Sequence, residues 1–494
     1  MSKFDDENGE EKKLDFDWMP AGCEALAGMY FVKKNLYGFV FLCFKICPLK
    51  YVDGEYDAII MGTGLTECVI SGLLSVNGKK VLHIDRNGYY GADAASLNLT
   101  NMFEKFRGTE AAPPSLGASR DWSIDLIPKF IMACGNLVKI LLHAKVTRYL
   151  EFKSIDGSFV YKDGKVQKVP ATPSEALNSA LMGFFEKRKF RSFLMFVEAY
   201  DKEKPATYMN GKTMDKVSMK ELYDYYGLDG NTQSFVGHAM ALQSDDDYLE
   251  KPAEVVVDAI KLYAYSLQRY GKSPYIYPLY GLGGLPEGFS RLCAIHGGTF
   301  MLNRSVEEIL FKDGKAWGIK AGNEVAKAPM VIGDPSYFED SKSRVTGKVI
   351  RSVCLLDHPV KDTDNAESVQ IIIPAAQVKR RNDIYVCVVS YAHMVASNGK
   401  YIAIVSTEAE TSNPVGEVAP GIALLGNVLE RFDNISDIRV PVAPGTADSC
   451  YMSKSYDATS HFETVADDVL SMYERITGSE LDMTISAELD EDDC

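Results

Sequence analysis

The sequence predicts an α/β fold built on a dinucleotide-binding β-α-β unit, with an all-helical segment inserted later in the chain. An apolar run at 58–61 is typical of a buried parallel strand, and Gly62-Thr63-Gly64 follows it directly. A helical segment over 65–76 then leads to a second apolar strand at 80–84. This strand ends at Asp85, about 20 residues after the first glycine, which is the spacing of the acidic residue in such units.

The third glycine of this motif is missing, because Glu67 stands in its place. A carboxylate in the first turn suits the helix dipole, but it opposes a bound diphosphate by its size and by its charge. Two unit charges about 4 Å apart repel by roughly 4 kcal/mol at an effective dielectric of about 20. We therefore expect the fold of a dinucleotide binder without a cofactor, and a cofactor site that tolerates Glu67 is the alternative.

The composition is that of a soluble globular protein, with 46% hydrophobic and 24% charged residues among 494. A net charge of −15 argues against non-specific binding to nucleic acid or to an anionic membrane, and it favours a partner with a basic surface. The ten cysteines and seven histidines show no metal-ligand spacing. We therefore expect reduced, cytosolic thiols and no metal.

Residues 1–55 differ from the remainder of the chain. Residues 1–17 are highly charged, and 36–47 form an aromatic-rich run that is too short to span a membrane. We interpret residues 1–55 as a partly disordered extension of unknown role or an artefact of the gene assignment. An added strand or helix on the body and an interfacial anchor are the alternatives.

The change to helical periodicity from residue 170 predicts an all-helical domain II over 170–246. It interrupts a discontinuous domain I over 56–169 and 247–480. An acidic tail follows at 481–494. Thr172-Pro173-Ser174-Glu175 has the residues of a helix N-terminus and marks the start of domain II. The aromatic stripes of domain II form either a packed core or a cleft for an apolar ligand, and both interpretations stay open.

The second part of domain I has a flavoprotein-like arrangement. A strand at 299–302, a β-meander around the turn at 312–314 and a strand at 330–332 return to the parallel sheet. A hairpin is expected at 157–169, around a Lys-Asp-Gly-Lys turn. Three alternating strands indicate a second, mixed sheet, at 369–373, 384–390 and 401–406.

Tyrosines cluster between Tyr270 and Tyr280, among prolines and glycines. An exposed cluster would suit a protein-binding surface, whereas a buried cluster would serve a structural loop, and both remain possible at this point. The chain contains no GxSxG elbow and no P-loop, and no histidine stands at a useful spacing from a nucleophile. We therefore expect a protein that is not an enzyme.

Several motifs over residues 53–478 resemble the Rab GDP-dissociation inhibitor family: GTGLTEC, IDRNGYYG, RDWSIDLIPKF, MGFFEKRKFRSFL, RYGKSPYIYPLYGLG, IYVCVVSYAH, GKYIAI and SYDATSHFET. The resemblance implies a flavoprotein-like domain I with a helical domain II and no bound flavin. It also implies a cytosolic protein that binds GDP-bound, geranylgeranylated Rab GTPases, slows GDP release and extracts them through transient membrane contact. A Rab escort protein for prenylation and a flavin-dependent oxidoreductase are the alternatives.

The resemblance also assigns residues to three sites. The Rab-binding surface lies on domain I, the prenyl-binding cleft lies in domain II, and an effector loop at 244–249 meets the membrane or a recycling factor. The residues implied for the Rab-binding surface are Tyr90, Arg120, Arg269, Leu279 and Tyr280; for the prenyl-binding cleft Leu181, Phe185, Phe193 and Phe196; and for the effector loop Ser244, Asp245, Asp246 and Tyr248.

Three positions depart from the family pattern. The family usually carries arginine where Ala118 and Ser244 stand here, and glutamate where Gly284 stands. The loss of two basic residues is expected to weaken docking or membrane extraction.

Overall fold

The computed structural model describes residues 54–108, 111–172, 174–175, 179 and 181–483. The predicted N-terminal extension and acidic tail fall outside these ranges, apart from residues 54–55 and 481–483. Among the described residues, no helix is long and apolar enough to cross a bilayer.

The predicted β-α-β unit is present, with strand β1 at Ala58–Met61, helix α1 at Leu65–Val76 and strand β2 at Val81–Ile84. These strands belong to a parallel five-stranded sheet of order β10-β2-β1-β14-β20. All four residues of β1 are buried, as the apolar run predicts for a central parallel strand. The other strands of the sheet are β10 (Thr299–Met301), β14 (Val331–Gly333) and β20 (Cys450–Met452).

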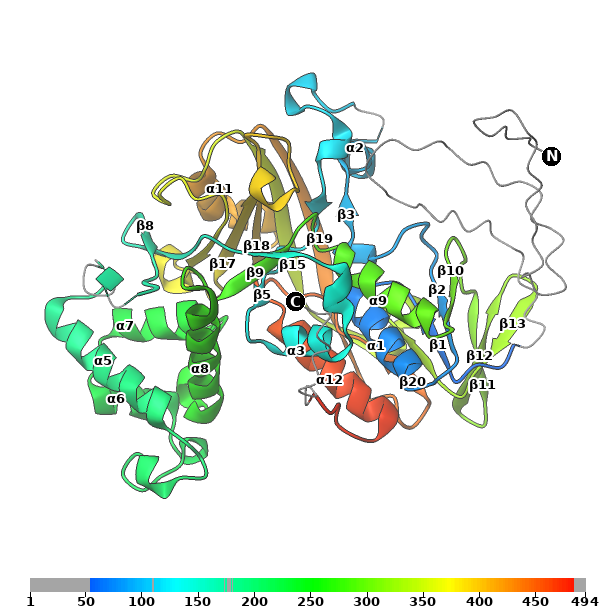
Figure 1. The fold of residues 1–494 in the computed structure, drawn as a ribbon, viewed down its shortest axis with the longest axis horizontal. Coiled ribbons are helices and arrows are strands. Elements are labelled where there is room, and N and C mark those ends of the chain that lie inside the picture. The colour runs from blue at the N-terminus through cyan, green and yellow to red at the C-terminus, as the bar shows by residue number, and fades with distance from the viewer. Residues whose placement is uncertain (1–53, 109–110, 173, 176–178, 180, 484–494) are drawn as a thin grey trace, which may run out of the picture. The chain divides into compact units, whose positions relative to one another are not determined.

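Helices α9 (Gly284–Ile295) and α12 (Glu463–Thr477) lie beside α1 and cover the parallel sheet (Figure 1). Gly72 of α1 permits the close approach of α9, because an added Cβ would lie 3.1 Å from the Phe289 ring. The predicted meander is also present as an antiparallel sheet of β11 (Glu308–Lys312), β12 (Lys315–Ala321) and β13 (Glu324–Lys327).

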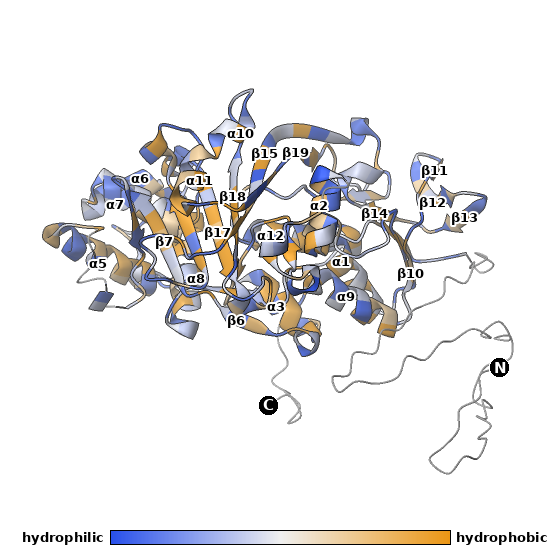
Figure 2. Ribbon diagram, turned by 90° about the horizontal axis from the view of Figure 1, so that it is seen from above, coloured by the Kyte–Doolittle hydropathy of each residue, from blue (hydrophilic) through white to orange (hydrophobic). Residues whose placement is uncertain are grey.

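A mixed sheet of seven strands has the order β19-β15-β18-β17-β16-β7-β8. The predicted hairpin forms its edge, and β7 pairs in parallel with β16, so a segment from early in the chain completes a sheet made later. Figure 2 shows β17 and β18 as largely hydrophobic, whereas β15 and β19 mix hydrophilic and hydrophobic residues. The strands are β7 (Gly157–Lys162), β8 (Lys165–Lys168), β15 (Ser343–Leu356), β16 (Val369–Ile373), β17 (Ile384–Ser390), β18 (Tyr401–Glu408) and β19 (Glu430–Pro441).

Short elements connect these sheets. The small strands are β3 (Ser96–Leu97), β4 (Ile124–Asp125), β5 (Ile131–Met132), β6 (Phe152–Ser154) and β9 (Tyr275–Pro278). The connecting helices are α2 (Leu99–Arg107), α3 (Asn136–His143), α10 (Pro414–Glu417) and α11 (Ala419–Leu425).

The helical region contains α5 (Phe184–Ala199), α6 (Met219–Tyr226), α7 (Gly230–Ser234), a π-helix at Phe235–Met240 and α8 (Ala253–Tyr270) (Figure 1). Helices α5, α6 and α8 pack against one another, so the helical layer includes residues beyond 246. The division between the two domains stays a prediction. At the start of this region, the Glu175 amide donates to Thr172 Oγ1 at 3.2 Å, as expected of an N-cap.

Candidate functional site

The carboxylate of Asp85 ends β2 as predicted, but its hydrogen bonds are made within the protein. Oδ2 accepts from the amide and the hydroxyl of Thr63, at 2.7 and 2.6 Å. Oδ1 accepts from the Asn87 amide at 2.7 Å and from the Tyr337 hydroxyl at 3.1 Å. Because a carboxylate has about four acceptor positions, Asp85 has none left for the hydroxyls of a ribose.

Glu67 is buried, and its carboxyl lies over Gly64 at the N-terminus of α1, where an added Cβ would collide with it. Oε1 accepts a hydrogen bond from Ser453 Oγ at 2.6 Å. Burial, with the neighbouring Asp334, raises the pKa of Glu67 to about 8. The raised pKa favours the neutral carboxyl and weakens the expected repulsion of a diphosphate by a like charge. Glu67 also obstructs a diphosphate by the position of its carboxyl over Gly64.

A polar cavity of about 390 Å³ lies beside these residues, with Glu67, Asp85, Arg86, Asp334 and Tyr337 in its wall. Asp334 is close to Gly62, since a Cβ there would lie 2.6 Å from its Oδ2. The two glycines that admit a diphosphate in a dinucleotide site are thus each covered by a carboxyl side chain. The residues present do not fit a flavin dinucleotide.

Segments that carry the residues predicted for the Rab-binding surface meet around the buried carboxyl of Asp125. It accepts hydrogen bonds from Ser96 Oγ, from the Tyr277 hydroxyl and, at 3.0 Å, from the Leu282 amide. Burial raises the pKa of Asp125 to about 7. Sequence reasoning missed Asp125, which ties three distant segments of the chain together.

Two predicted surface residues lie exposed next to this junction. The side chain of Arg120 is 91% exposed, and Tyr280 is 65% exposed. Ser123 Oγ, just after the Arg120 turn, donates to the Tyr280 carbonyl at 2.6 Å, so the two segments are neighbours. Tyr90 is half-buried with its ring 5.8 Å from that of Phe300.

Leu279 and Arg269 are the other two residues predicted for the Rab-binding surface. Leu279 is half-buried just after β9, and Arg269 is exposed at the end of α8. Of the tyrosine cluster, Tyr275 and Tyr277 are buried, whereas Tyr270 and Tyr280 are exposed. Each interpretation of the cluster therefore applies to part of it.

The residues predicted for the prenyl-binding cleft have different environments. Phe193 is fully buried on α5, with its ring 5.7 Å from the rings of both Tyr223 and Tyr226. Phe196 joins the same cluster at 5.6 Å from Tyr226. Leu181 is buried, but Phe185 is 80% exposed and outside the cluster. A packed aromatic core therefore surrounds two of the four residues.

The predicted effector loop is folded into a short 3-10 helix at Asp246–Glu250, capped by Asp245, whose Oδ1 accepts from the Asp247 amide at 2.9 Å. Ser244 is half-buried. Tyr248 is buried, and its hydroxyl donates to the Gln233 carbonyl at 3.3 Å. Asp246 is 68% exposed. The loop is thus anchored by its tyrosine, and its Asp246 and Asp247 are exposed to solvent.

His238 connects the predicted effector loop to the segment before β17. Its Nε2 lies 3.1 Å from Asp246 Oδ1, and its Nδ1 lies 2.7 Å from Asp383 Oδ2. Burial alone would lower the pKa of His238, but the hydrogen bonds to the two carboxylates raise it to about 10. A charged imidazole therefore joins the loop to the segment before β17.

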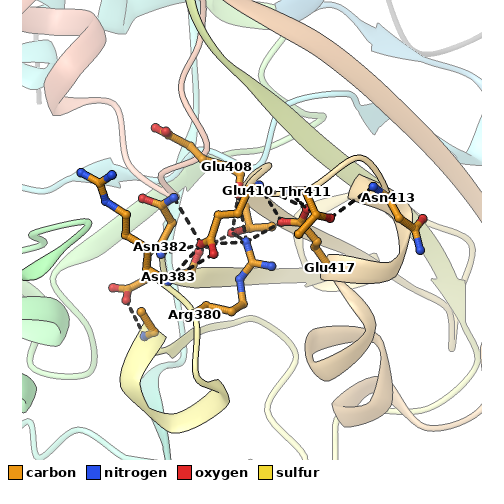
Figure 3. A network of polar contacts seen from close by, with 11 residues as sticks. Arg380, Asn382, Asp383, Glu408, Glu410, Thr411, Asn413 and Glu417 are labelled. Carbon is orange, nitrogen blue, oxygen red and sulfur yellow. Dashed lines mark hydrogen bonds and ion pairs between the residues drawn. The ribbon is translucent and has the colours of Figure 1, made fainter.

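A polar network holds Asp383 in place (Figure 3). Its Oδ1 accepts from the Ala375 amide at 2.8 Å, and its carbonyl accepts from Thr407 Oγ1 at 2.7 Å. Nearby, Arg380 pairs with Glu417 at 2.7 Å and with Glu410 at 3.1 Å. Asp383, the partner of His238, is therefore held by hydrogen bonds from Ala375 and Thr407, next to the ion pairs of Arg380.

Comparisons with known proteins agree with the resemblance of the sequence motifs. The model of the GDP dissociation inhibitor family matches residues 52–488. A probable secretory pathway GDP dissociation inhibitor 1 of Schizosaccharomyces pombe is 56% identical over 431 residues, which are 87% of this chain and 98% of that protein.

Solved structures agree with this match. A Rab GDI structure from Plasmodium falciparum is similar with a TM-score of 0.83 and 47% identity, over 86% of this chain and 99% of that one. An oxidoreductase from Methanosarcina mazei, at 16% identity and a TM-score of 0.51 over 85% of this chain and all of that one, has the same fold. The predicted flavoprotein-like fold is thereby confirmed. With a family match over most of its length and a relative of such high identity, the chain belongs to the GDP dissociation inhibitor family.

Proposed function

We propose that this protein binds GDP-bound, prenylated Rab GTPases, slows the release of GDP, and extracts these GTPases from membranes for return through the cytoplasm. The family match over residues 52–488 and the likeness to a Rab GDI structure support the proposal. Moving a geranylgeranyl chain of roughly 20 carbons from the bilayer into water costs more than about 10 kcal/mol of free energy. A carrier must therefore offer an apolar site that compares with the bilayer.

The protein has no enzymatic role in this proposal. The dinucleotide site is closed by its own side chains, since Glu67 covers Gly64 and Asp85 has four internal hydrogen bonds. An absorbance spectrum of the purified protein tests this point, because a bound flavin would give visible absorbance and would contradict it.

We assign the Rab-binding surface to Tyr90, Arg120, Arg269, Leu279 and Tyr280. Arg120→Ala combined with Tyr280→Ala is expected to weaken binding of GDP-loaded Rab by roughly thirtyfold or more, because exposed arginine and tyrosine are frequent binding hot spots. Both side chains are exposed, so the fold is unaffected. Release of a fluorescent GDP analogue from Rab measures the effect.

A matched control removes an arginine and a tyrosine elsewhere, as Arg344→Ala with Tyr225→Ala. Both are exposed, on β15 and on α6. Equal rates of GDP release with the surface variant, the control and the unchanged protein would count against this assignment.

The prenyl-binding cleft is proposed to involve Leu181, Phe185, Phe193 and Phe196. Because Phe193 is fully buried, an acidic substitution there would unfold the region rather than test lipid binding. Phe185→Ser avoids this difficulty, since Phe185 is 80% exposed. It is expected to weaken binding of prenylated Rab by roughly tenfold or more, because the bound lipid would bury the phenylalanine side chain. Binding of unprenylated Rab is expected to stay unchanged.

Phe311→Ser on β11 is the control for Phe185→Ser, since Phe311 is also exposed, at 45%. An equal loss of prenylated and unprenylated Rab binding by Phe185→Ser would contradict the lipid role of this residue.

A further inference from the structure

The outer face of α5 carries an exposed stripe of Phe184, Arg188, Arg191 and Met195. Phe184 is 83% exposed and Met195 is 59% exposed, and both arginines are exposed as well. Their spacing of three or four residues places the four side chains on one side of the helix, over about 16 Å. The side that packs on the helical region is different and includes Glu186, Phe193 and Val197.

The two arginines of this stripe are not used by the fold. Among the described residues, the structure records no ion pair for Arg188 or Arg191, whereas the adjacent Lys189 binds the Gly227 carbonyl at 2.6 Å and Glu186 at 3.2 Å. The stripe is therefore a basic and apolar surface on a protein whose net charge is −15. The positive charge of the two arginines favours an anionic partner.

The effector loop is poorly suited to an anionic surface. Asp246 and Asp247 are 68% and 65% exposed there, and Ser244 replaces the arginine expected from the family pattern. The arginines of α5 could supply the attraction to an anionic surface that the loop does not provide.

We propose that the stripe of Phe184, Arg188, Arg191 and Met195 is a docking surface for an anionic lipid bilayer. Phenylalanine and methionine would enter the boundary between headgroups and acyl chains, and the arginines would lie at the level of the phosphates. A bilayer interface offers an apolar region next to negative charge over an extended surface. It therefore fits a convex helix face better than the groove of a partner protein would.

This inference rests on the proposed function, because it places the proposed prenyl site at the bilayer. The ring of Phe184 lies 5.7 Å from that of Phe185, the exposed residue assigned to the prenyl-binding cleft. The membrane surface thus begins beside the residue that is proposed to receive the lipid.

Co-sedimentation of the full chain with vesicles, in the absence of Rab, tests the docking surface. Binding is expected to vesicles of phosphatidylcholine with phosphatidylserine, and to weaken on addition of salt. Arg188→Gln with Arg191→Gln is expected to lower this binding by roughly tenfold or more and to remove the preference for phosphatidylserine. Phe184→Ser with Met195→Ser is expected to lower binding to vesicles of phosphatidylcholine alone as well as to those that contain phosphatidylserine.

The controls are Phe311→Ser and Lys312→Gln with Lys315→Gln, which change an exposed phenylalanine and two exposed lysines on β11 and β12. Equal vesicle binding by the α5 variants and these controls would overturn the inference. It would also be overturned if Phe184→Ser weakened capture of prenylated Rab in membrane-free solution as strongly as vesicle binding, because the residue would then belong to the prenyl site.

Extraction of prenylated Rab separates this inference from the proposed function. If the unchanged protein and the α5 variants extract GDP-loaded Rab equally fast, the docking surface is wrong and the function stands. If vesicle binding depends on α5 but no Rab is extracted, the docking surface stands and the proposed function is wrong.

Discussion

Asp457→Ala is expected to lower the free energy of unfolding by about 3–5 kcal/mol, since it leaves a buried ammonium without a counter-charge. Lys129 is fully buried, and its Nζ lies 2.6 Å from Asp457 Oδ1. Its other contacts are neutral oxygens of Thr459 and His461, at 3.0 to 3.1 Å. Urea unfolding measures the loss. Asp457 belongs to the SYDATSHFET motif, so the pair joins that motif to the segment after β4.

Asp340→Ala is the matched control, because the Asp340 carboxylate pairs with Arg439 while 90% exposed. Removal of such a surface pair is expected to change stability by about 1 kcal/mol or less. If Asp457→Ala were no more destabilising than this control, the buried pair would not hold the two segments together.

The Lys129–Asp457 pair also predicts a dependence of stability on acid. Burial alone would raise the pKa of Asp457, but the Lys129 ammonium holds it well below its ordinary value. The stabilisation is therefore present above the unfolded value near 4 and is lost as the pH falls below it. Asp457→Ala is expected to flatten this acid limb, and an unchanged slope below pH 4 would contradict the assignment.

His238→Ala is expected to destabilise the protein by about 3 kcal/mol and to release the predicted effector loop. The Asp383 carboxylate is fully buried and would lose its charged partner. Limited proteolysis within residues 244–250, alongside urea unfolding, measures both effects. Asp246→Asn is the control, since this carboxylate is 68% exposed and its loss should affect the loop alone. Cleavage of His238→Ala at the unchanged rate would contradict the anchoring role.

The same contact gives a pH dependence of opposite sign. The pKa of His238 is raised to about 10, so its contribution is complete below the unfolded value of about 6.5 and is lost as the pH rises through 10. The charged groups that face it are Asp246 and Asp383. Cleavage of the loop is expected to increase between pH 7 and 10 in the unchanged protein and to vary less in His238→Ala.

The β-α-β unit and the hairpin could be predicted from the sequence because their signals are local. An apolar run, a Gly-x-Gly turn and helical periodicity gave β1 and α1 within their observed bounds. The strands β15 and β19 were not predicted. β19 is at the edge of its sheet and pairs on one side, so many of its residues are half-exposed and polar, without the alternation that identifies a strand.

The tertiary contacts of the site could not be predicted in this way. His238 and Asp383 are 145 residues apart, and neither stands in a pattern of spacing that indicates a partner. The raised pKa of Glu67 comes from its burial in the fold and from Asp334, which is far from it in the sequence. Resemblance to a family placed Arg120 and Tyr280 on one surface, but the Ser123 contact that makes their segments neighbours is visible only in the structure.

Membrane extraction tests the central claim most directly. Prenylated Rab on vesicles, loaded with GDP or with a non-hydrolysable GTP analogue, is mixed with the full chain and sedimented. The proposed function predicts that the GDP form appears in the supernatant with this protein, while the GTP-analogue form stays on the vesicles. Release of neither form, or of both forms equally, would contradict it.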